Sequence, residues 1–342
     1  MPRNFKELKP AYGFDDVAIA PGDITINPEM ADISTNFDGI KLDIPFIASA
    51  MDAVVDPKFA IEMTKAGGLG VMNMDGLHTR YEDATVAYEE IASAPREEAT
   101  AIMQKIYSAP QKPELIAKKV EEVKKGGGTA AVSFVPQNAK RMAPLAVEAG
   151  ADMIVVQGTV VTARHSSKSL KGLVFADLIK DLNVPVLVGN TVSYEVTKEL
   201  MQQGIAGVMV GVGPGSVCTS REVLGIGIPQ VSATVECAAA RDDFFKETGK
   251  HIPIITDGGI RTGGDVCKSF AAGANAVMIG SPFAKTEEAP AHGYHWGMAT
   301  WHDSLPRGTR INVGTEYSLH QLLYGPSSRT DGTLNLVGAL QV

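Results

Sequence analysis

Cys218 is the residue of this sequence whose surroundings best suit covalent chemistry. It follows a glycine-rich run that begins at Gly211, whereas Cys237 and Cys267 fall in helix-like stretches among alanines, where a small thiol packs as a hydrophobic side chain. Three scattered cysteines are too few for a disulfide framework or a zinc site. A cysteine attacks as its thiolate, which backbone amides, an arginine such as Arg221 or a helix N-terminus stabilise. On these features alone, a covalent nucleophile and an ordinary loop thiol are equally favoured at Cys218.

A second group of residues suits the binding of a phosphorylated small molecule. Asp257-Gly258-Gly259 and Gly280-Ser281 each end an apolar run. Glycine lets an anion approach backbone N–H groups closely, and a carboxylate such as Asp257 accepts hydrogen bonds from ribose hydroxyls. One Gly-Gly pair alone more often marks a tight turn, but two such ends on consecutive runs favour a phosphate site.

Eight short apolar, β-branched runs are predicted to position these residues as strands. The runs are continuous and do not alternate with polar residues, which is typical of parallel strands buried on both faces. They occupy residues 44–51, 68–72, 129–134, 152–157, 185–190, 206–213, 252–259 and 276–281.

The segments between these runs have helical spacing. Examples are residues 113–128, residues 193–204 with Ser193 as N-cap, and residues 231–249, which Gly249 ends. Eight alternating strands and helices favour an α/β fold, the closed (β/α)₈ TIM barrel, as a single domain over residues 1–342. The alternative, an open Rossmann-like sheet, would carry a GxGxxG turn after the first strand, and none is present there. Because barrel enzymes build their sites at the carboxyl ends of the strands, the Cys218 loop and both glycine loops are expected to converge.

Composition narrows the class of partner. The chain has 342 residues, 44% hydrophobic and 20% charged, and a net charge of −8 without a basic block, which argues against a nucleic-acid polymer as partner. No run is long enough to span a membrane, and the polar N-terminus lacks the apolar core of a signal peptide. We expect a cytoplasmic protein that binds neither nucleic acid nor membrane.

The sequence GVGPGSVCTSR around Cys218 closely resembles the cysteine loop of the IMP dehydrogenase/GMP reductase family. Further motifs agree in order over nearly the whole chain: FDDVAIAP (14–21), ASAMDAVVD (48–56), GLGVMN (68–73), VLVGNTV (186–192), DGGIRTGGDVCK (257–268), VMIGSPFAKTEEAP (277–290) and WGMAT (296–300). The chain is most similar to the branch of IMP dehydrogenase-related proteins from cyanobacteria and actinobacteria, which lacks the regulatory CBS domains. Residues 73–113, where those domains are usually inserted, look helical.

The resemblance implies an NAD-dependent oxidation of IMP to XMP, in which the Cys218 thiolate attacks carbon 2 of the purine and the resulting thioimidate is hydrolysed. It places Ser49, Met51 and Asn190 around the base and ribose, Asp257 on the ribose, and Gly297, Met298 and Ala299 at the base edge. The phosphate would be held by Ser216, Gly258, Gly259, Gly280 and Ser281. It also implies a homotetramer or homo-octamer, and a monovalent cation such as K⁺ bound by the carbonyls of Gly213, Gly215 and Cys218.

The chain departs from the family pattern at several catalytic positions. Gln157 stands where an acidic residue contacts the nicotinamide ribose, and with Gly211 it is the expected cofactor contact. Ser220 replaces a catalytic threonine and keeps the hydroxyl. The flap after WGMAT is short, and no Arg-Tyr pair for activating water is recognisable in it. Arg307 is the predicted catalytic substitute, with Arg310 and His302 as alternatives.

Two other functions fit the same motifs. A GMP reductase, which converts GMP to IMP with NADPH, uses the same thioimidate, and PGSVCTSR resembles it as strongly. A purine-nucleotide-binding barrel without catalysis is the other possibility, because Gln157 and the short flap are consistent with lost activity. Turnover with IMP and NAD, or with GMP and NADPH, distinguishes the three.

Overall fold

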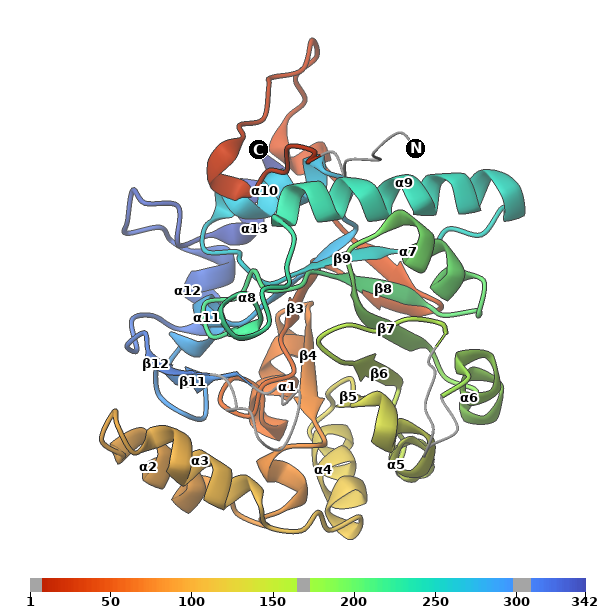
Figure 1. The fold of residues 1–342 in the computed structure, drawn as a ribbon. Coiled ribbons are helices and arrows are strands. Elements are labelled where there is room, and N and C mark those ends of the chain that lie inside the picture. Colours follow the sequence, from red (N-terminus) through yellow and green to blue (C-terminus); the bar gives the residue numbers. More distant parts are fainter. Residues whose placement is uncertain (1–7, 165–172, 298–308) are drawn as a thin grey trace, which may run out of the picture.

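Eight parallel strands close into a barrel in the computed structural model of the 342-residue chain, which describes residues 8–164, 173–297 and 309–342 (Figure 1). The strands pair in sequence order, and the last closes the barrel against the first. They are β3 (Phe46–Ala48), β4 (Leu69–Asn73), β5 (Ala131–Phe134), β6 (Met153–Gln157), β7 (Val186–Thr191), β8 (Gly207–Val210), β9 (Ile254–Asp257) and β10 (Ala276–Ile279). The predicted (β/α)₈ TIM barrel is therefore confirmed.

Each barrel strand lies within its predicted apolar run, except that β4 and β7 each extend one residue beyond the end of theirs. Most are shorter than their runs, because the last residues of a run turn into the loops that carry the polar side chains. The run predicted over 206–213, for example, pairs only over Gly207–Val210, and the rest leads into the Cys218 loop. These shortened ends are what leave room for a site.

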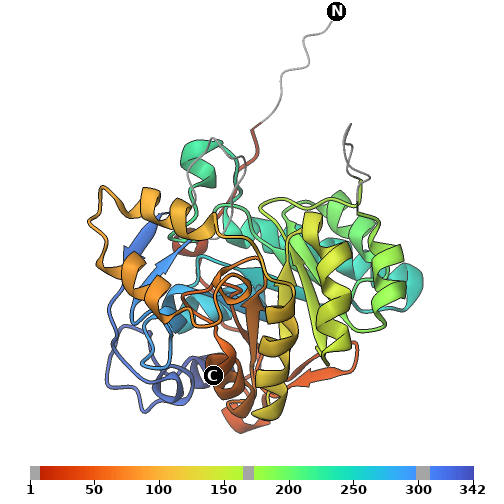
Figure 2. The ribbon, with the colours of Figure 1, turned by 90° about the horizontal axis from the view of Figure 1, so that it is seen from below.

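Helices surround the strands, as the view from below shows (Figure 2). The connections contribute α1 (Pro57–Lys65), α4 (Glu114–Lys125), α5 (Pro136–Glu148), α6 (Phe175–Leu182), α7 (Tyr194–Met201), α9 (Gln230–Thr248) and α10 (Gly263–Ala271). Local sequence explains their ends: the Asp56 side chain accepts from the Phe59 N–H at the start of α1, and Gly249, with φ +72°, ends α9 as predicted. Ser193 does precede α7, but its side chain makes no capping hydrogen bond.

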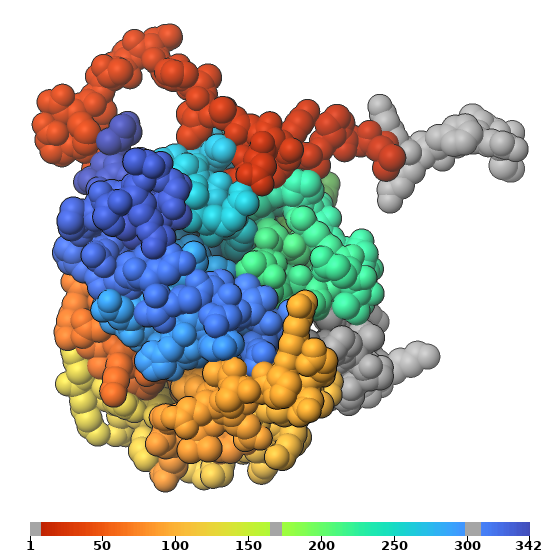
Figure 3. Space-filling view, turned by 90° about the vertical axis from the view of Figure 1, so that its left-hand side faces the viewer, coloured from red at the N-terminus to blue at the C-terminus, as the bar shows by residue number. Residues whose placement is uncertain are grey.

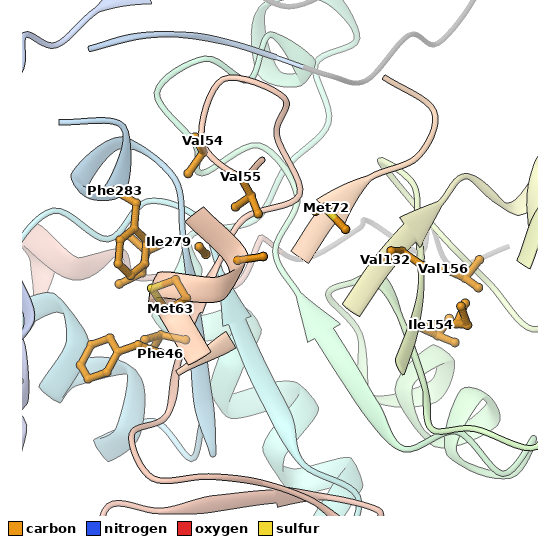
Figure 4. Packing of buried hydrophobic residues seen from close by; sticks show 14 of the residues in the cluster. Phe46, Val54, Val55, Met63, Met72, Val132, Ile154, Val156, Ile279 and Phe283 are labelled. Carbon is orange, nitrogen blue, oxygen red and sulfur yellow. The ribbon is translucent and has the colours of Figure 1, made fainter. Parts of the chain in front are cut away.

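Two layers of apolar side chains fill the molecule. One layer lies between the strands and the surrounding helices, and Figure 4 shows part of it, from Phe46 and Phe283 on one side to Val132 and Val156 on the other. The other lies inside the barrel and includes Phe37 and Leu42, which come from a hairpin of β1 (Thr35–Phe37) and β2 (Ile40–Leu42) that the apolar runs do not predict. With both faces of each strand buried, the barrel is a rigid frame for its loops.

The long connection between β4 and β5 is helical, as predicted. It holds η3 (Leu77–Thr79), α2 (Thr85–Ser93), α3 (Ala99–Tyr107) and α4. In Figure 1, α2 and α3 lie side by side beyond β11 (Tyr294–Trp296) and β12 (Arg310–Asn312), a second hairpin that the sequence does not reveal. Trp296 of β11 is fully buried in the cluster that α2 and α3 form with this hairpin.

The ends of the chain carry short elements. The N-terminal segment contains η1 (Phe14–Asp16) and η2 (Pro28–Met30), and part of it stands clear of the body of the molecule (Figure 3). After the last barrel strand come the short helices α11 (Ser281–Ala284), α12 (Leu319–Tyr324) and α13 (Leu336–Gln341), and another short helix, α8 (Ser220–Val223), follows β8. Of the helices that the structure describes, none has the length and apolar character to span a membrane.

Candidate active site

A cavity of about 560 Å³ opens at the carboxyl ends of the barrel strands. Its walls come from η1, the loops after β3, β8 and β9, the end of β10, and the β11–β12 hairpin. Nine of the predicted site residues line it: Ser49, Met51, Gly215, Ser216, Asp257, Gly258, Gly259, Gly280 and Ser281. The structure thus brings together residues that the sequence separates by more than 200 positions, and the volume is in the range of small-molecule sites.

The Cys218 loop forms one wall of this cavity. The Cys218 N–H donates to the Gly215 carbonyl at 3.0 Å, which closes a turn, and the thiol lies 3.2 Å from the hydroxyl of Ser220, the buried first residue of α8. Ser216 and Val217 line the cavity, but Cys218 does not. Cys218 thus directly follows a residue that lines the cavity, and its thiol is held toward Ser220.

Arg221 supports the loop and does not contact the thiol. Its guanidinium donates to the Ile228 carbonyl at 3.0 Å. Its side chain also packs on Gly213, where φ is +82° and an added Cβ would lie 2.7 Å from the arginine Cγ. Gly213 is therefore required for packing, whichever role its carbonyl plays.

Asp257 is the centre of a hydrogen-bonded network at the ends of β6, β7 and β9. Its Oδ2 accepts from the Gln157 amide at 2.9 Å and from the Asn190 amide at 2.8 Å. Burial raises the pKa of Asp257 to about 6, although the hydrogen bonds from Asn190 and Gln157 act in the opposite direction. A carboxylate whose proton affinity is raised in this way, at the wall of a cavity, is a group that titrates near neutral pH.

Asn190 lies behind Asp257 in this network. Its side chain is buried, does not line the cavity, and donates to the Gly211 carbonyl at 2.9 Å as well as to Asp257. Its predicted contact with the nucleotide stays a prediction, and the structure gives it a supporting position.

The two predicted cofactor contacts belong to the same network. The Gln157 side-chain amide donates to Asp257 and to the side-chain oxygen Oδ1 of Asn190, 3.2 Å away. Gly211 has φ +147°, and a Cβ there would lie 2.3 Å from the Asp257 carbonyl oxygen. These contacts do not show how either residue would meet a dinucleotide, so the assignment remains a prediction.

Gln230, at the start of α9, is a supporting residue that sequence reasoning missed. Its amide donates to the Val210 carbonyl at 2.7 Å and to the Asp257 carbonyl at 3.2 Å, which ties the ends of β8 and β9 together. It also lines the cavity. Gln230 closes the motif GIGIPQ, and that position is the one signal that could have pointed to it.

The glycine- and serine-lined part of the cavity has the character of an anion site. Gly258 and Gly259 have φ of +89° and +79°, and a Cβ on either would come within 3.2 Å of Pro214. The Ser216 and Ser281 hydroxyls lie 2.8 Å apart, and Ser281 is also 3.0 Å from Nε2 of His295. Burial lowers the pKa of His295 to about 4. His295, which sequence reasoning also missed, precedes the WGMAT motif by one residue.

The other two cysteines are placed as structural residues. Cys237 is buried in α9, where burial raises the pKa of its thiol to about 12. Cys267, in α10, donates from its thiol to the Ala339 carbonyl at 3.2 Å. None of the three cysteines lines the cavity, but Cys218 directly follows Val217, which does.

The residues after β11 are described only in part. Gly297 follows Trp296, whose indole N–H donates to the Tyr107 hydroxyl at 2.8 Å. The predicted Met298, Ala299 and Arg307, and the alternative His302, lie outside the described residues. Arg310 is described, and its guanidinium donates to the Ala94 carbonyl at 2.8 Å and to other carbonyls at the end of α2.

Metal binding by side chains has no candidate in the described part of the chain, which contains no suitable group of three His, Cys, Asp or Glu residues. The predicted cation site is of another type, formed by backbone carbonyls. One of its three members, the Gly215 carbonyl, accepts the Cys218 N–H. That site stays a prediction.

Comparisons with known proteins agree with the motifs. The family model of the IMP dehydrogenase/GMP reductase domain matches residues 11–300. An uncharacterized oxidoreductase of Mycolicibacterium smegmatis is 40% identical over 339 residues, which are 96% of this chain and 90% of that protein. The inosine-5'-monophosphate dehydrogenase of Cryptosporidium parvum is 33% identical over 83% of this chain and 70% of that enzyme. An IMP dehydrogenase/GMP reductase-like protein from Corynebacterium glutamicum has a crystal structure with a TM-score of 0.92 and 35% identity, covering 98% of this chain and 90% of that one.

Proposed function

Because the chain belongs to the IMP dehydrogenase/GMP reductase family of oxidoreductases, we propose that it oxidises IMP to XMP with NAD through a covalent intermediate on Cys218. The observation that carries this proposal is the shared cavity. The loop that bears Cys218 forms one wall of a cavity that also holds a titratable carboxylate, Asp257, and a glycine- and serine-lined part that suits a phosphate.

The proposed nucleotide lies along this cavity. Its phosphate meets the Gly259 and Gly280 backbone with the Ser216 and Ser281 hydroxyls, and its ribose diol donates to Asp257. This orientation brings the base toward the loop that bears Cys218. The ionised carboxylate is the form that accepts both ribose hydroxyls, so ribose binding favours loss of the Asp257 proton.

In the proposed reaction the Cys218 thiolate forms a bond to carbon 2 of the purine. A hydride leaves that carbon, for which NAD would be the acceptor. Water then adds to carbon 2 of the thioimidate, the C–S bond breaks, and the oxygen stays on the product while the thiol is restored. Ser220, whose hydroxyl lies 3.2 Å from the sulfur, holds the thiol in place before attack. Arg307 is the proposed activator of the water.

The test is turnover with each substrate pair. Purified protein is incubated with IMP plus NAD, and separately with GMP plus NADPH, and both the dinucleotide absorbance and the purine product are followed. Formation of XMP that is lost in Cys218→Ala and kept in Cys267→Ala supports the proposal. Oxidation of NADPH by GMP would identify a GMP reductase, and binding of IMP without any flux would identify a non-catalytic barrel.

The remaining parts of the proposal follow the family. They are a homotetramer or homo-octamer, K⁺ at the carbonyls of Gly213, Gly215 and Cys218, contacts of Gln157 and Gly211 with the cofactor, and of Gly297, Met298 and Ala299 with the base edge. A cytoplasmic role in purine nucleotide synthesis is part of the same proposal.

A further inference from the structure

The anion-binding end of the cavity has no uncommitted cation among the described residues that line it. The Arg261 guanidinium pairs with Asp15 at 2.6 Å, and the Arg221 guanidinium donates to the Ile228 carbonyl at 3.0 Å. A phosphate at this end must therefore be held mainly by backbone N–H groups and by neutral side-chain donors. How those neutral donors are directed becomes decisive, because a hydroxyl can either donate or accept.

Three side chains form a continuous hydrogen-bonded chain there. His295 of β11 lies 3.0 Å through Nε2 from the Ser281 hydroxyl, and that hydroxyl lies 2.8 Å from the Ser216 hydroxyl. All three residues line the cavity. His295 is almost fully buried, at 1% exposure, whereas Ser216 is exposed. These hydrogen bonds therefore connect the buried ring of His295 to the exposed hydroxyl of Ser216.

The other ring nitrogen of His295 decides the direction of this chain. Nδ1 is buried and has no hydrogen-bond partner among the described residues. A neutral imidazole carries one N–H, and a buried N–H without an acceptor is rarer in proteins than a buried acceptor without a donor. The proton is therefore placed on Nε2, which donates to Ser281. Nδ1 then carries a lone pair without a donor, which is the less costly of the two alternatives. The low pKa of His295 agrees, because the ring is then neutral at pH 7.

We propose that His295 is a positioning residue that directs the Ser281 and Ser216 hydroxyls so that they present a proton donor to the 5'-phosphate of the bound nucleotide. Nε2–H donates to Ser281, the Ser281 hydroxyl donates to Ser216, and the Ser216 hydroxyl donates to the phosphate. No proton is transferred, since each group keeps its own hydrogen. The inference rests on the proposed nucleotide-binding function and adds the residue that directs these hydroxyls at the phosphate.

The proposal also connects the phosphate with the nucleophile. Ser216 lies two residues before Cys218 in the same loop. A hydroxyl held by Ser281 on one side and by the phosphate on the other restrains the loop that carries the thiol. Binding energy from the phosphate is thereby used to orient the reacting group.

Calorimetric binding of IMP and of inosine tests the proposal, because inosine lacks the phosphate. A hydrogen bond to a charged group leads us to expect that His295→Phe weakens IMP binding roughly 10- to 100-fold and leaves inosine binding unchanged. His295→Gln, which can place an amide N–H near the position of Nε2, should recover most of the loss. His295→Asn, which is one methylene shorter, should not.

A double-mutant cycle shows whether His295 acts on the phosphate through Ser281 or independently of it. If His295 acts through Ser281, then His295→Phe in the Ser281→Ala background should cause no further loss of IMP affinity. Additive losses, an equal loss for inosine, or unchanged IMP affinity in His295→Phe would overturn the proposal. Thermal unfolding of each variant shows whether the fold is retained.

The ring tautomer gives a readout that does not depend on any ligand. Nitrogen-15 NMR of histidine-labelled protein at pH 7, with the His295→Gln variant to identify the signal among the seven histidines, should show a neutral ring protonated at Nε2. A ring protonated at Nδ1, or a charged ring, overturns the inference while leaving the proposed function intact. If the wild-type protein binds neither IMP nor GMP, the proposed function fails as well.

Discussion

Protonation of Asp257 should control both the binding of the ribose and the stability of the protein. The carboxylate is held between the Gln157 and Asn190 amides at 2.9 and 2.8 Å, and burial raises its pKa to about 6. The perturbation is Asp257→Asn, which keeps the size of the side chain and an oxygen that can accept from both amides. It removes the charge and places an N–H group where the ribose hydroxyls need an acceptor.

The size of the binding effect follows from the pKa. With a value of about 6, roughly one carboxyl group in ten is ionised at pH 5, so nucleoside affinity should fall about tenfold between pH 7.5 and pH 5. The free energy of unfolding should change as well. The folded carboxyl binds its proton more tightly than the unfolded one, whose pKa is 3.8, so stability falls as pH rises from about 4 to about 6. Above pH 6 the buried carboxylate lowers the free energy of unfolding by at most about 3 kcal/mol.

The binding assay uses inosine and guanosine between pH 5 and 8, because a phosphate titrates near pH 6 and would obscure the carboxylate. In wild-type protein the affinity should rise with pH and level off above pH 7. Asp257→Asn should bind the nucleosides roughly 10- to 100-fold more weakly at pH 7.5, with no dependence on pH. Asp15→Asn is the matched control, since Asp15 lines the same cavity but pairs with Arg261.

Denaturant unfolding at two pH values completes the test. Asp257→Asn should be more stable than wild type at pH 7.5, by up to about 3 kcal/mol, and no more stable at pH 4. A pH-independent nucleoside affinity in the wild-type protein would refute the role of Asp257. A variant whose stability relative to wild type is no greater at pH 7.5 than at pH 4 would contradict the raised pKa, because ionising the buried carboxyl would then cost nothing.

Further substitutions test the proposed nucleophile, phosphate site and water-activating group. Cys218→Ala should reduce turnover to background and leave nucleotide binding and thermal stability within error of wild type; substantial residual turnover would contradict covalent catalysis. Gly259→Val, at φ +79° and beside Pro214, should weaken IMP about tenfold or more and inosine little, measured by calorimetry. If the two ligands are affected alike, the phosphate lies elsewhere. Arg307→Ala should keep the NADH burst at the wild-type rate and lose steady-state XMP formation in stopped-flow assays; a parallel fall of both would assign it to binding.

The strands, the fold and the position of Cys218 in a loop could be predicted from the sequence because they depend on local patterns. A continuous apolar run such as 276–281 is a buried parallel strand in almost any α/β arrangement, and eight such runs separated by helices leave few topologies. Glycine at 258 and 259 signals a turn that side chains disfavour, and the structure shows positive φ at both. The same local reasoning separates Cys218, in a loop, from Cys237, in a helix.

The partners of the site residues depended on the closure of the barrel. Gln157, Asn190 and Asp257 are each the polar end of a different strand, and nothing local indicates that both amides are directed at one carboxylate oxygen. His295 and Gln230 were missed for the same reason. A histidine in a short hairpin strand and a glutamine at the start of a helix have no distinctive local pattern. Their roles arise only when the tertiary fold brings Ser281 and the Asp257 carbonyl within hydrogen-bonding distance. Backbone periodicity determines which residues form an element, whereas the direction of a polar side chain is set by the acceptors and donors that distant elements place around it.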